Sequence, residues 1–154
     1  MDLINILEGV ILEQSSGSFL ISPTAAFVKG RRYGEQRSYG KHLAVDIEIS
    51  VGTKLYAPHS GYISKVDNSK CGCGIDIGKD GDNYQSRFCH MSKISVSDGQ
   101  WVSKGDFVGL SGGAKGERCS GNSEGPHLHW NFKVTGKPTN PYNGWVSASR
   151  LPGS

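Results

Sequence analysis

Short runs of alternating apolar and polar residues, separated by glycine-containing turns, recur through most of this chain of 154 residues. In the clearest run, residues 43–49, large apolar side chains alternate with smaller or acidic ones. This period of two places the apolar side chains on one face of a strand. The 22 glycines follow no fixed repeat, which argues against collagen-like and solenoid folds. We therefore predict a mainly β domain built on an antiparallel sheet.

The length of the chain fits one such domain, which we expect to span residues 22–154. Apolar residues at helical spacing between positions 3 and 12 predict a short N-terminal helix, so residues 1–21 are expected to form a helix and linker packed on the domain. The polar, glycine-containing segments 25–41 and 112–125 are predicted to be long loops, and we expect them to form the walls of a substrate groove.

The charge pattern disfavours two classes of partner. The net charge is +3 and no dense run of lysine and arginine occurs, which gives little support to nucleic-acid binding. No stretch is long and apolar enough to span a bilayer. The N-terminal residues lack a basic segment and carry acids within their apolar part, so they do not resemble a signal peptide. We expect a monomer that binds no nucleic acid and does not span a membrane.

Two histidines, His127 and His129, lie one residue apart at the start of the β-prone run 128–134. In an extended strand their side chains point to the same face, with Leu128 between them toward the core. Neutral imidazole is a common zinc ligand, so the pair is suited to a metal site. The pair alone fits a structural role equally well, and other ligands in the chain have to decide between the two interpretations.

A second pair, His42 and Asp46, opens the first predicted strand. Residues four apart in a strand share a face, and the opposite face carries Leu43, Val45 and Ile47. An acid and a histidine at this spacing are natural metal ligands, although the pair alone also fits a hydrogen bond on a solvated face.

The two pairs together supply enough ligands for catalytic zinc, which commonly takes three protein ligands and leaves a fourth position for water. His90 lies at the end of another predicted strand and is a further candidate for the site. The fifth histidine, His59, lies in a predicted turn, and we expect it to be a solvated loop residue without a role in the site.

Four motifs, in order, resemble the catalytic domain of the lysostaphin/LytM-type zinc metallopeptidases, which cut peptide bonds in bacterial peptidoglycan. They are a His-x-x-x-Asp block in residues 40–47, a glycine-punctuated apolar segment in residues 51–63, a histidine block with glycine-separated strands in residues 90–112, and a His-x-His block in residues 125–130. The resemblance covers roughly residues 22–145.

This resemblance assigns a role to each of the five motif residues. It implies that His42, Asp46 and His129 bind one zinc ion per chain. It implies that His127 and His90 are catalytic, with His127 as the general base and His90 either stabilising the oxyanion or passing a proton to the leaving amine.

The resemblance also implies a peptidoglycan peptide as substrate and a site of action outside the cytoplasm, in the cell wall or periplasm, reached by secretion or as a phage lysin. We expect the aromatic residues Tyr39, Trp130 and Tyr33 to line the groove. The sequence departs from the family pattern at Phe88, where a tyrosine is frequent, so any role of a hydroxyl at that position is lost.

The four cysteines allow two readings. Cys73 and Cys89 flank the predicted turn at residues 79–82 and could form a disulfide across a hairpin, leaving Cys71 and Cys119 to tie the 112–125 loop to the sheet. Two disulfides would indicate an oxidising compartment. The alternative is four reduced thiols.

Two other functions compete with a peptidoglycan endopeptidase. A non-catalytic relative that regulates other hydrolases usually lacks one or more ligands, whereas all five expected positions are occupied here. A structural zinc domain would close its site with four ligands. The leading hypothesis is therefore a zinc-dependent endopeptidase, and either a glycyl bridge or a D-alanyl–diamino-acid link could be the bond it cleaves.

Overall fold

The structure is a computed structural model that describes residues 20–153. These residues form twelve strands and one short 3-10 helix. Their bounds are β1 Gln36–Arg37, β2 Gly40–Lys41, β3 Val45–Ile47, β4 Lys54–Tyr56, β5 Gly61–Asn68, β6 Gly72–Ile77, β7 Tyr84–Cys89, β8 Met91–Ile94, β9 Trp101–Val102, β10 Phe107–Ser111, η1 Arg118–Ser120, β11 Leu128–Val134 and β12 Lys137–Pro138.

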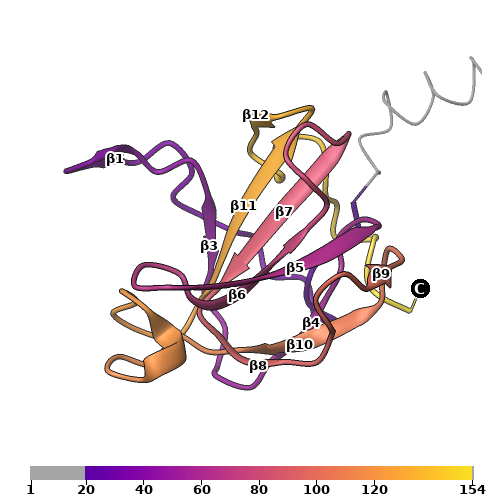
Figure 1. Ribbon diagram of the computed structural model, residues 1–154. Coiled ribbons are helices and arrows are strands. Elements are labelled where there is room, and N and C mark those ends of the chain that lie inside the picture. Colours follow the sequence, from indigo (N-terminus) through magenta and orange to yellow (C-terminus); the bar gives the residue numbers. More distant parts are fainter. Residues whose placement is uncertain (1–19, 154) are drawn as a thin grey trace, which may run out of the picture.

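The strands form three sheets. The largest has the order β12-β11-β7-β6-β5-β9, and β3 pairs with β11 beside this path. A second sheet, β4-β10-β8, lies across one end of the first, and the small β1–β2 hairpin projects away from the body (Figure 1). All strand pairs in these sheets are antiparallel, which confirms the predicted fold class.

The alternation along β11 explains how this strand serves the core and a functional face together. Leu128, Trp130 and Phe132 are completely buried, whereas His129 and Asn131 on the other face are only partly covered. The buried side chains join one core between the two larger sheets. Its members are Leu20, Val45, Ile47, Leu55, Ala57, Ile63, Ile75, Ile77, Phe88, Met91, Val96, Val102, Val108, Leu128, Trp130, Phe132 and Val146.

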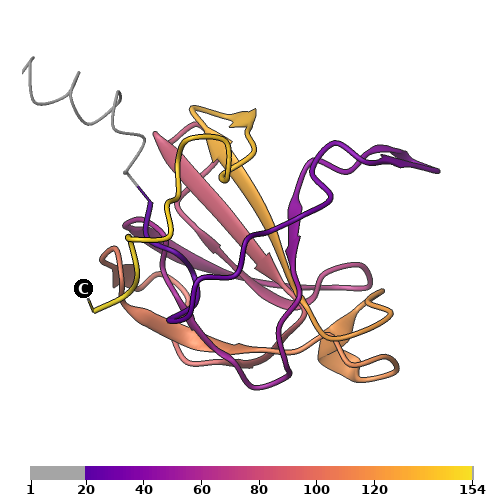
Figure 2. The ribbon, with the colours of Figure 1, turned by 180° about the vertical axis from the view of Figure 1, so that it is seen from behind.

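The two ends of the described chain meet behind the main sheet. Leu20 is completely buried and forms a parallel bridge with Val146, and the backbone of Ser22 donates a hydrogen bond to the carbonyl of Arg150. Figure 2 shows the first and last described segments running beside each other on this side. The predicted N-terminal helix lies outside the described residues, and the division between residues 21 and 22 stays a prediction.

Two local predictions need correction. The segment 25–41 is not wholly irregular, because it contains the β1–β2 hairpin. Leu43 was expected to face the core, but it is 43% exposed. The reason is that β3 begins only at Val45, so the strand alternation does not extend back to Leu43.

Within residues 20–153, no helix has the length and apolar character needed to cross a membrane.

Candidate metal centre and active site

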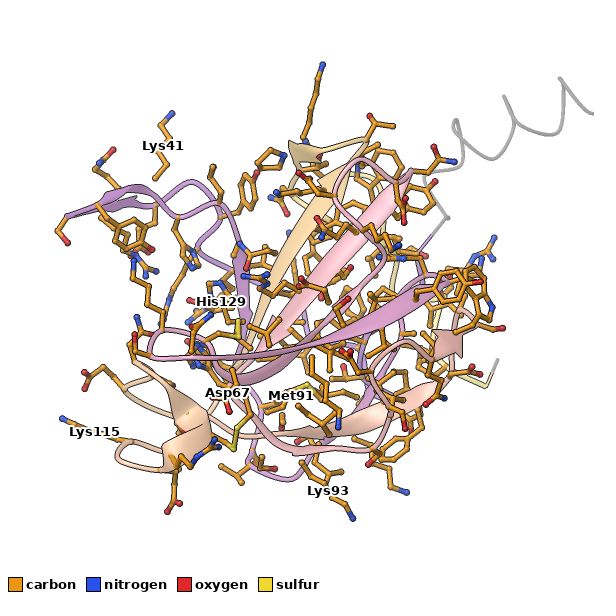
Figure 3. The ribbon with its side chains drawn as sticks, in the orientation of Figure 1. Lys41, Asp67, Met91, Lys93, Lys115 and His129 are labelled. Carbon is orange, nitrogen blue, oxygen red and sulfur yellow. A yellow bond between two sulfur atoms is a disulfide. The ribbon has the colours of Figure 1, made fainter. Side chains whose placement is uncertain are left out.

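The predicted ligands meet where two strands pair. The antiparallel register of β3 and β11 sets Asp46 directly opposite His129. His42 lies just before β3 and turns its ring toward the same point. Figure 3 labels His129, whose side chain lies near β3 below the projecting β1–β2 hairpin. The strand register therefore brings together residues that lie more than eighty positions apart in sequence.

The three ligand atoms form a nearly equilateral triangle. His129 Nδ1 lies 3.3 Å from Asp46 Oδ1, and His42 Nε2 lies 3.6 Å from Asp46 Oδ1. His42 Nε2 and His129 Nδ1 are 3.4 Å apart. Ligands at zinc-like bond lengths of about 2.0–2.1 Å in a tetrahedral arrangement are separated by about 3.3–3.4 Å. The spacing of this triangle fits a zinc ion.

Buried polar atoms without a hydrogen-bond partner also occur at this site. Among the described residues, two buried side-chain N or O atoms lack a hydrogen-bond partner, and both belong here: Asp46 Oδ1 and His90 Nδ1. A buried carboxylate oxygen without a partner is costly unless it binds a cation. The residues present therefore suit a divalent metal with nitrogen and oxygen ligands.

The surroundings of Asp46 favour the ionised form of its carboxyl group. Burial raises the pKa of its carboxyl group, but the nearby rings of His129, His42 and His127 outweigh this effect and hold the pKa below its ordinary value. Only the ionised form is a good ligand, so these contacts favour metal binding.

The ring of His42 is fixed by the backbone. Its Nδ1 lies 3.0 Å from the carbonyl oxygen of Arg32, which can only accept, so Nδ1 carries the proton and Nε2 keeps its lone pair. Burial lowers the pKa of His42, which also favours the neutral form that binds metal. Arg32 adopts a left-handed conformation with φ +72°, which is uncommon for a residue with a side chain.

The ring of His127 is held in a similar way on the open side of the triangle. Its Nδ1 donates to the carbonyl of Gly125 at 2.8 Å, which leaves the lone pair on Nε2. Nε2 lies 3.7 Å from Asp46 Oδ1 and therefore faces the same point as the three ligand atoms. A backbone hydrogen bond from His127 to Gly112 places this residue at the start of β11.

His90 occupies the break between β7 and β8. Its backbone has φ +63°, and its N–H donates to the carbonyl of Cys71. Its ring centroid lies 4.9 Å from that of His127 and 5.7 Å from that of His129. Burial, followed by the charges of His127 and His129, lowers the pKa of His90 to about 4. The structure thus gathers all five histidine and aspartate residues predicted for the site.

Two disulfides brace this region, but their pairing differs from the one proposed from the sequence. Cys71 is bonded to Cys89, and Cys73 is bonded to Cys119. The first bond connects the segment before β6 to the end of β7, directly before His90. The second connects β6 to η1 in the 112–125 loop. The predicted tie between this loop and the sheet exists, with Cys73 in the place of Cys71.

A groove of about 510 Å³ lies against the metal centre. It is lined by Tyr39, Lys41, His42, Leu43, Ala44, Asn68, Ser69, Lys70, Cys71, Arg87, Cys89, His90, Asn122, His129 and Asn131. These residues come from the β1–β2 hairpin and the segment that follows it, the β5–β6 turn, the end of β7 with His90, the 112–125 loop and β11, so both predicted loops contribute to its walls.

The three aromatic residues expected in the groove have different positions. Tyr39 is 68% exposed and lies in the groove wall. Trp130 was wrongly assigned to the groove, because it lies on the core face of β11 and is completely buried. Tyr33 packs against the core instead of lining the groove, and burial raises the pKa of its hydroxyl group.

His59 is not the solvated residue predicted from the sequence. It is 2% exposed, and burial lowers its pKa to about 4. Its Nδ1 donates to the carbonyl of Ser60, and its Nε2 accepts from the hydroxyl of Ser86, which itself accepts from Trp130 Nε1. This chain of hydrogen bonds lies behind β11, on the opposite side from the metal centre.

The sequence did not reveal the groups that orient the site histidines. The carbonyls of Arg32 and Gly125 act through the backbone, so their residue types leave no pattern to detect. Gly112 lies against the same region, because a Cβ atom there would come within 2.5 Å of the carbonyl oxygen of His90.

Comparisons with known proteins identify the family of this chain. The model of peptidase family M23 matches residues 40–141, which contain all five site residues. The chain belongs to peptidase family M23. Its fold is that of a lysostaphin/LytM-type peptidase domain, as the sequence motifs predicted.

Individual relatives extend the comparison. The chain is 35% identical over 119 residues to an uncharacterized metalloprotease of Haemophilus influenzae, covering 77% of this chain and 24% of that protein. It is 34% identical over 99 residues to the peptidoglycan DD-endopeptidase ShyA of Vibrio cholerae, covering 64% and 22%. The structure of the antimicrobial peptidase lysostaphin from Staphylococcus simulans matches with a TM-score of 0.63 and 24% identity, covering 83% of this chain and 54% of that one. The chain thus spans about a quarter of the length of the Haemophilus and Vibrio proteins.

Proposed function

We propose that this M23 domain is a zinc-dependent endopeptidase that hydrolyses peptide bonds in bacterial peptidoglycan. The observation that carries the proposal is the triangle of His42 Nε2, Asp46 Oδ1 and His129 Nδ1, with sides of 3.3–3.6 Å, beside two further histidines. Three ligands and an open side are the arrangement of a catalytic zinc site, whereas a structural site is closed by four.

In this proposal His42, Asp46 and His129 hold the zinc ion. Zinc in such a site lowers the pKa of its water toward about 7 and polarises the scissile carbonyl. The three residues keep the geometry fixed, because Asp46 and His129 belong to paired strands and His42 is fixed through the Arg32 carbonyl.

The two remaining histidines would handle the proton and the oxyanion. His127 presents the lone pair of Nε2 toward the triangle and can take a proton from an attacking water as a general base. His90 lies beside it, and its Nδ1 has no partner within the described part of the chain. This nitrogen is available to donate a hydrogen bond to the developing oxyanion when it carries the proton.

The substrate assignment rests on the relatives and on the groove. ShyA, named as a peptidoglycan DD-endopeptidase, shares 34% identity with this domain over 99 residues. The groove beside the metal centre has room for an extended peptide, and the exposed ring of Tyr39 offers an apolar contact at its wall. The two disulfides suit an oxidising compartment such as the periplasm or the cell surface, where peptidoglycan lies.

Zinc analysis combined with digestion of purified peptidoglycan tests this function. We expect one zinc ion per chain, release of peptide fragments from the wall, and loss of release after treatment with a chelator, with recovery on addition of zinc. His127→Ala should keep the zinc and lose the activity. A wild-type protein that holds zinc and binds peptidoglycan but releases no fragments would instead be a non-catalytic member of the family. Mass spectrometry of the released fragments would identify the bond that is cleaved.

A further inference from the structure

Asn131 lies next to the metal centre and contacts the segments that carry two of the ligands. We propose that Asn131 is a positioning residue that holds His129 with Nδ1 toward the metal and clamps the His42 segment against β11. The inference rests on the proposed zinc site and assigns a role to a residue outside the ligand set and the catalytic pair.

The first contact sets the orientation of the His129 ring. Asn131 follows His129 by two positions in β11, so both side chains emerge on the groove face of the strand. His129 Nε2 lies 3.0 Å from Asn131 Oδ1. A carbonyl oxygen only accepts, so Nε2 must carry the proton, and the lone pair of the neutral ring is left on Nδ1. Nδ1 is the atom that faces Asp46 and His42.

The second contact fixes the orientation of the Asn131 amide itself. Asn131 Nδ2 donates to the backbone carbonyl of Leu43 at 3.2 Å. If the amide were turned around, two oxygens that can only accept would face each other at Leu43. The two contacts are therefore compatible only in the orientation that accepts from His129.

This second contact also acts where the backbone pairing ends. The β3–β11 register runs from Leu128 opposite Ile47 to Trp130 opposite Val45 and goes no further. Leu43 and the adjacent His42 lie beyond that point. The side chain of Asn131 adds one hydrogen bond beyond the last paired residues of β3 and β11. It therefore helps to fix the distance between His42 and His129.

Partners of this kind influence metal affinity. A hydrogen bond to the second nitrogen of a ligating histidine fixes its tautomer and ring orientation and raises its basicity, and removal typically costs 10–100-fold in metal affinity. Asn131 makes this bond to His129, as the Arg32 carbonyl does to His42. A side chain can be replaced, so the Asn131 contact is open to direct test.

Two variants of similar size separate the acceptor role from the clamp. Asn131→Leu removes both contacts, whereas Asn131→Asp keeps an acceptor for His129 Nε2 and loses the donor to Leu43. Zinc affinity would be measured by competition with a chromogenic chelator. We expect Asn131→Leu to weaken binding about 10–100-fold and Asn131→Asp to weaken it less, because the acceptor for His129 remains and only the contact with Leu43 is lost. Gln85→Leu is the matched control, because Gln85 lies in the adjacent strand β7 opposite Lys133, away from the ligands.

Nitrogen-15 NMR of the metal-free protein provides a second measurement. The wild type should show His129 as the Nε2–H tautomer, and Asn131→Leu should show a mixture of the two tautomers. Unchanged zinc affinity in Asn131→Leu would overturn the proposal, and an equal loss in Asn131→Asp and Asn131→Leu would overturn the role of Asn131 as the acceptor for His129. A wild type that binds zinc but cleaves no peptidoglycan would refute the proposed function, while the affinities of these variants would still decide the role of Asn131.

Discussion

The buried histidine behind β11 makes the stability of this domain sensitive to mild acid. His59 is 2% exposed and surrounded by the rings of Tyr84 and Phe132. Both of its ring nitrogens are used by the neutral form, one as donor to Ser60 and one as acceptor from Ser86. Protonation would place a charge in the core and remove the acceptor, so the folded protein resists it.

The size of the effect follows from the pKa. Burial lowers the pKa of His59 from 6.5 to about 4 in the folded protein, whereas the unfolded chain keeps the ordinary value. Between these pH values the unfolded state binds more protons, so stability rises with pH and is lost as the pH falls from 6.5 toward 4. For these two pKa values the loss between pH 7.5 and pH 5 is about 2 kcal/mol from His59 alone.

Comparison with a variant that cannot titrate isolates this contribution. We would unfold wild type and His59→Gln with urea at both pH values, with a chelator present so that metal release does not contribute. The other histidines are shared, so the difference between the two losses reports His59. We expect the wild type to lose about 2 kcal/mol more than His59→Gln. Equal losses in the two proteins would refute the buried, neutral state of His59.

Three further predictions concern the site and its supports. Gly112→Ala should lower activity and leave the zinc content unchanged, because the added Cβ would come within 2.5 Å of the His90 carbonyl; activity equal to wild type would contradict this. The double variant Cys73→Ser, Cys119→Ser should lose up to about 4 kcal/mol in urea unfolding, because the lost disulfide closes a long loop; an unchanged unfolding midpoint would contradict this. Tyr39→Ala should raise the KM for soluble wall peptides without changing Tm, since the exposed ring supports no core contact; a fall in Tm with an unchanged KM would contradict this.

Strand geometry explains why the sequence could predict which residues lie together at the candidate metal centre. A period of two placed His42 and Asp46 together, and the same rule placed His127 beside His129. The order of the motifs, through the resemblance to a known family, then separated His90 from the unrelated histidine at position 59. The structure adds the pairing of the two strands: β3 lies antiparallel to β11, with Asp46 opposite His129.

Features that depend on tertiary contacts were harder to predict. The disulfide partners were exchanged, because spacing along the chain does not say which cysteine of the Cys71–Cys73 pair faces β7 and which faces the loop. Trp130 was placed in the groove although the alternation that points His129 outward must point its neighbour inward. His59 looked solvated because Pro58 and Gly61 signal a turn, and nothing in the local sequence shows that the turn is buried.

The two faces of β11 connect these observations. On the groove face the strand presents His129 and Asn131, and on the core face Trp130 donates to Ser86, which donates to His59. A ligand in a strand holds its position only if the strand itself is anchored, and the buried ring of Trp130 anchors β11 between the two groove-facing residues. The buried hydrogen-bond chain and the proposed metal site therefore lie on opposite faces of the same strand. It follows that a bound metal should raise the stability of the domain, and that protonation of His59 should weaken the support for the ligands even though His59 touches none of them.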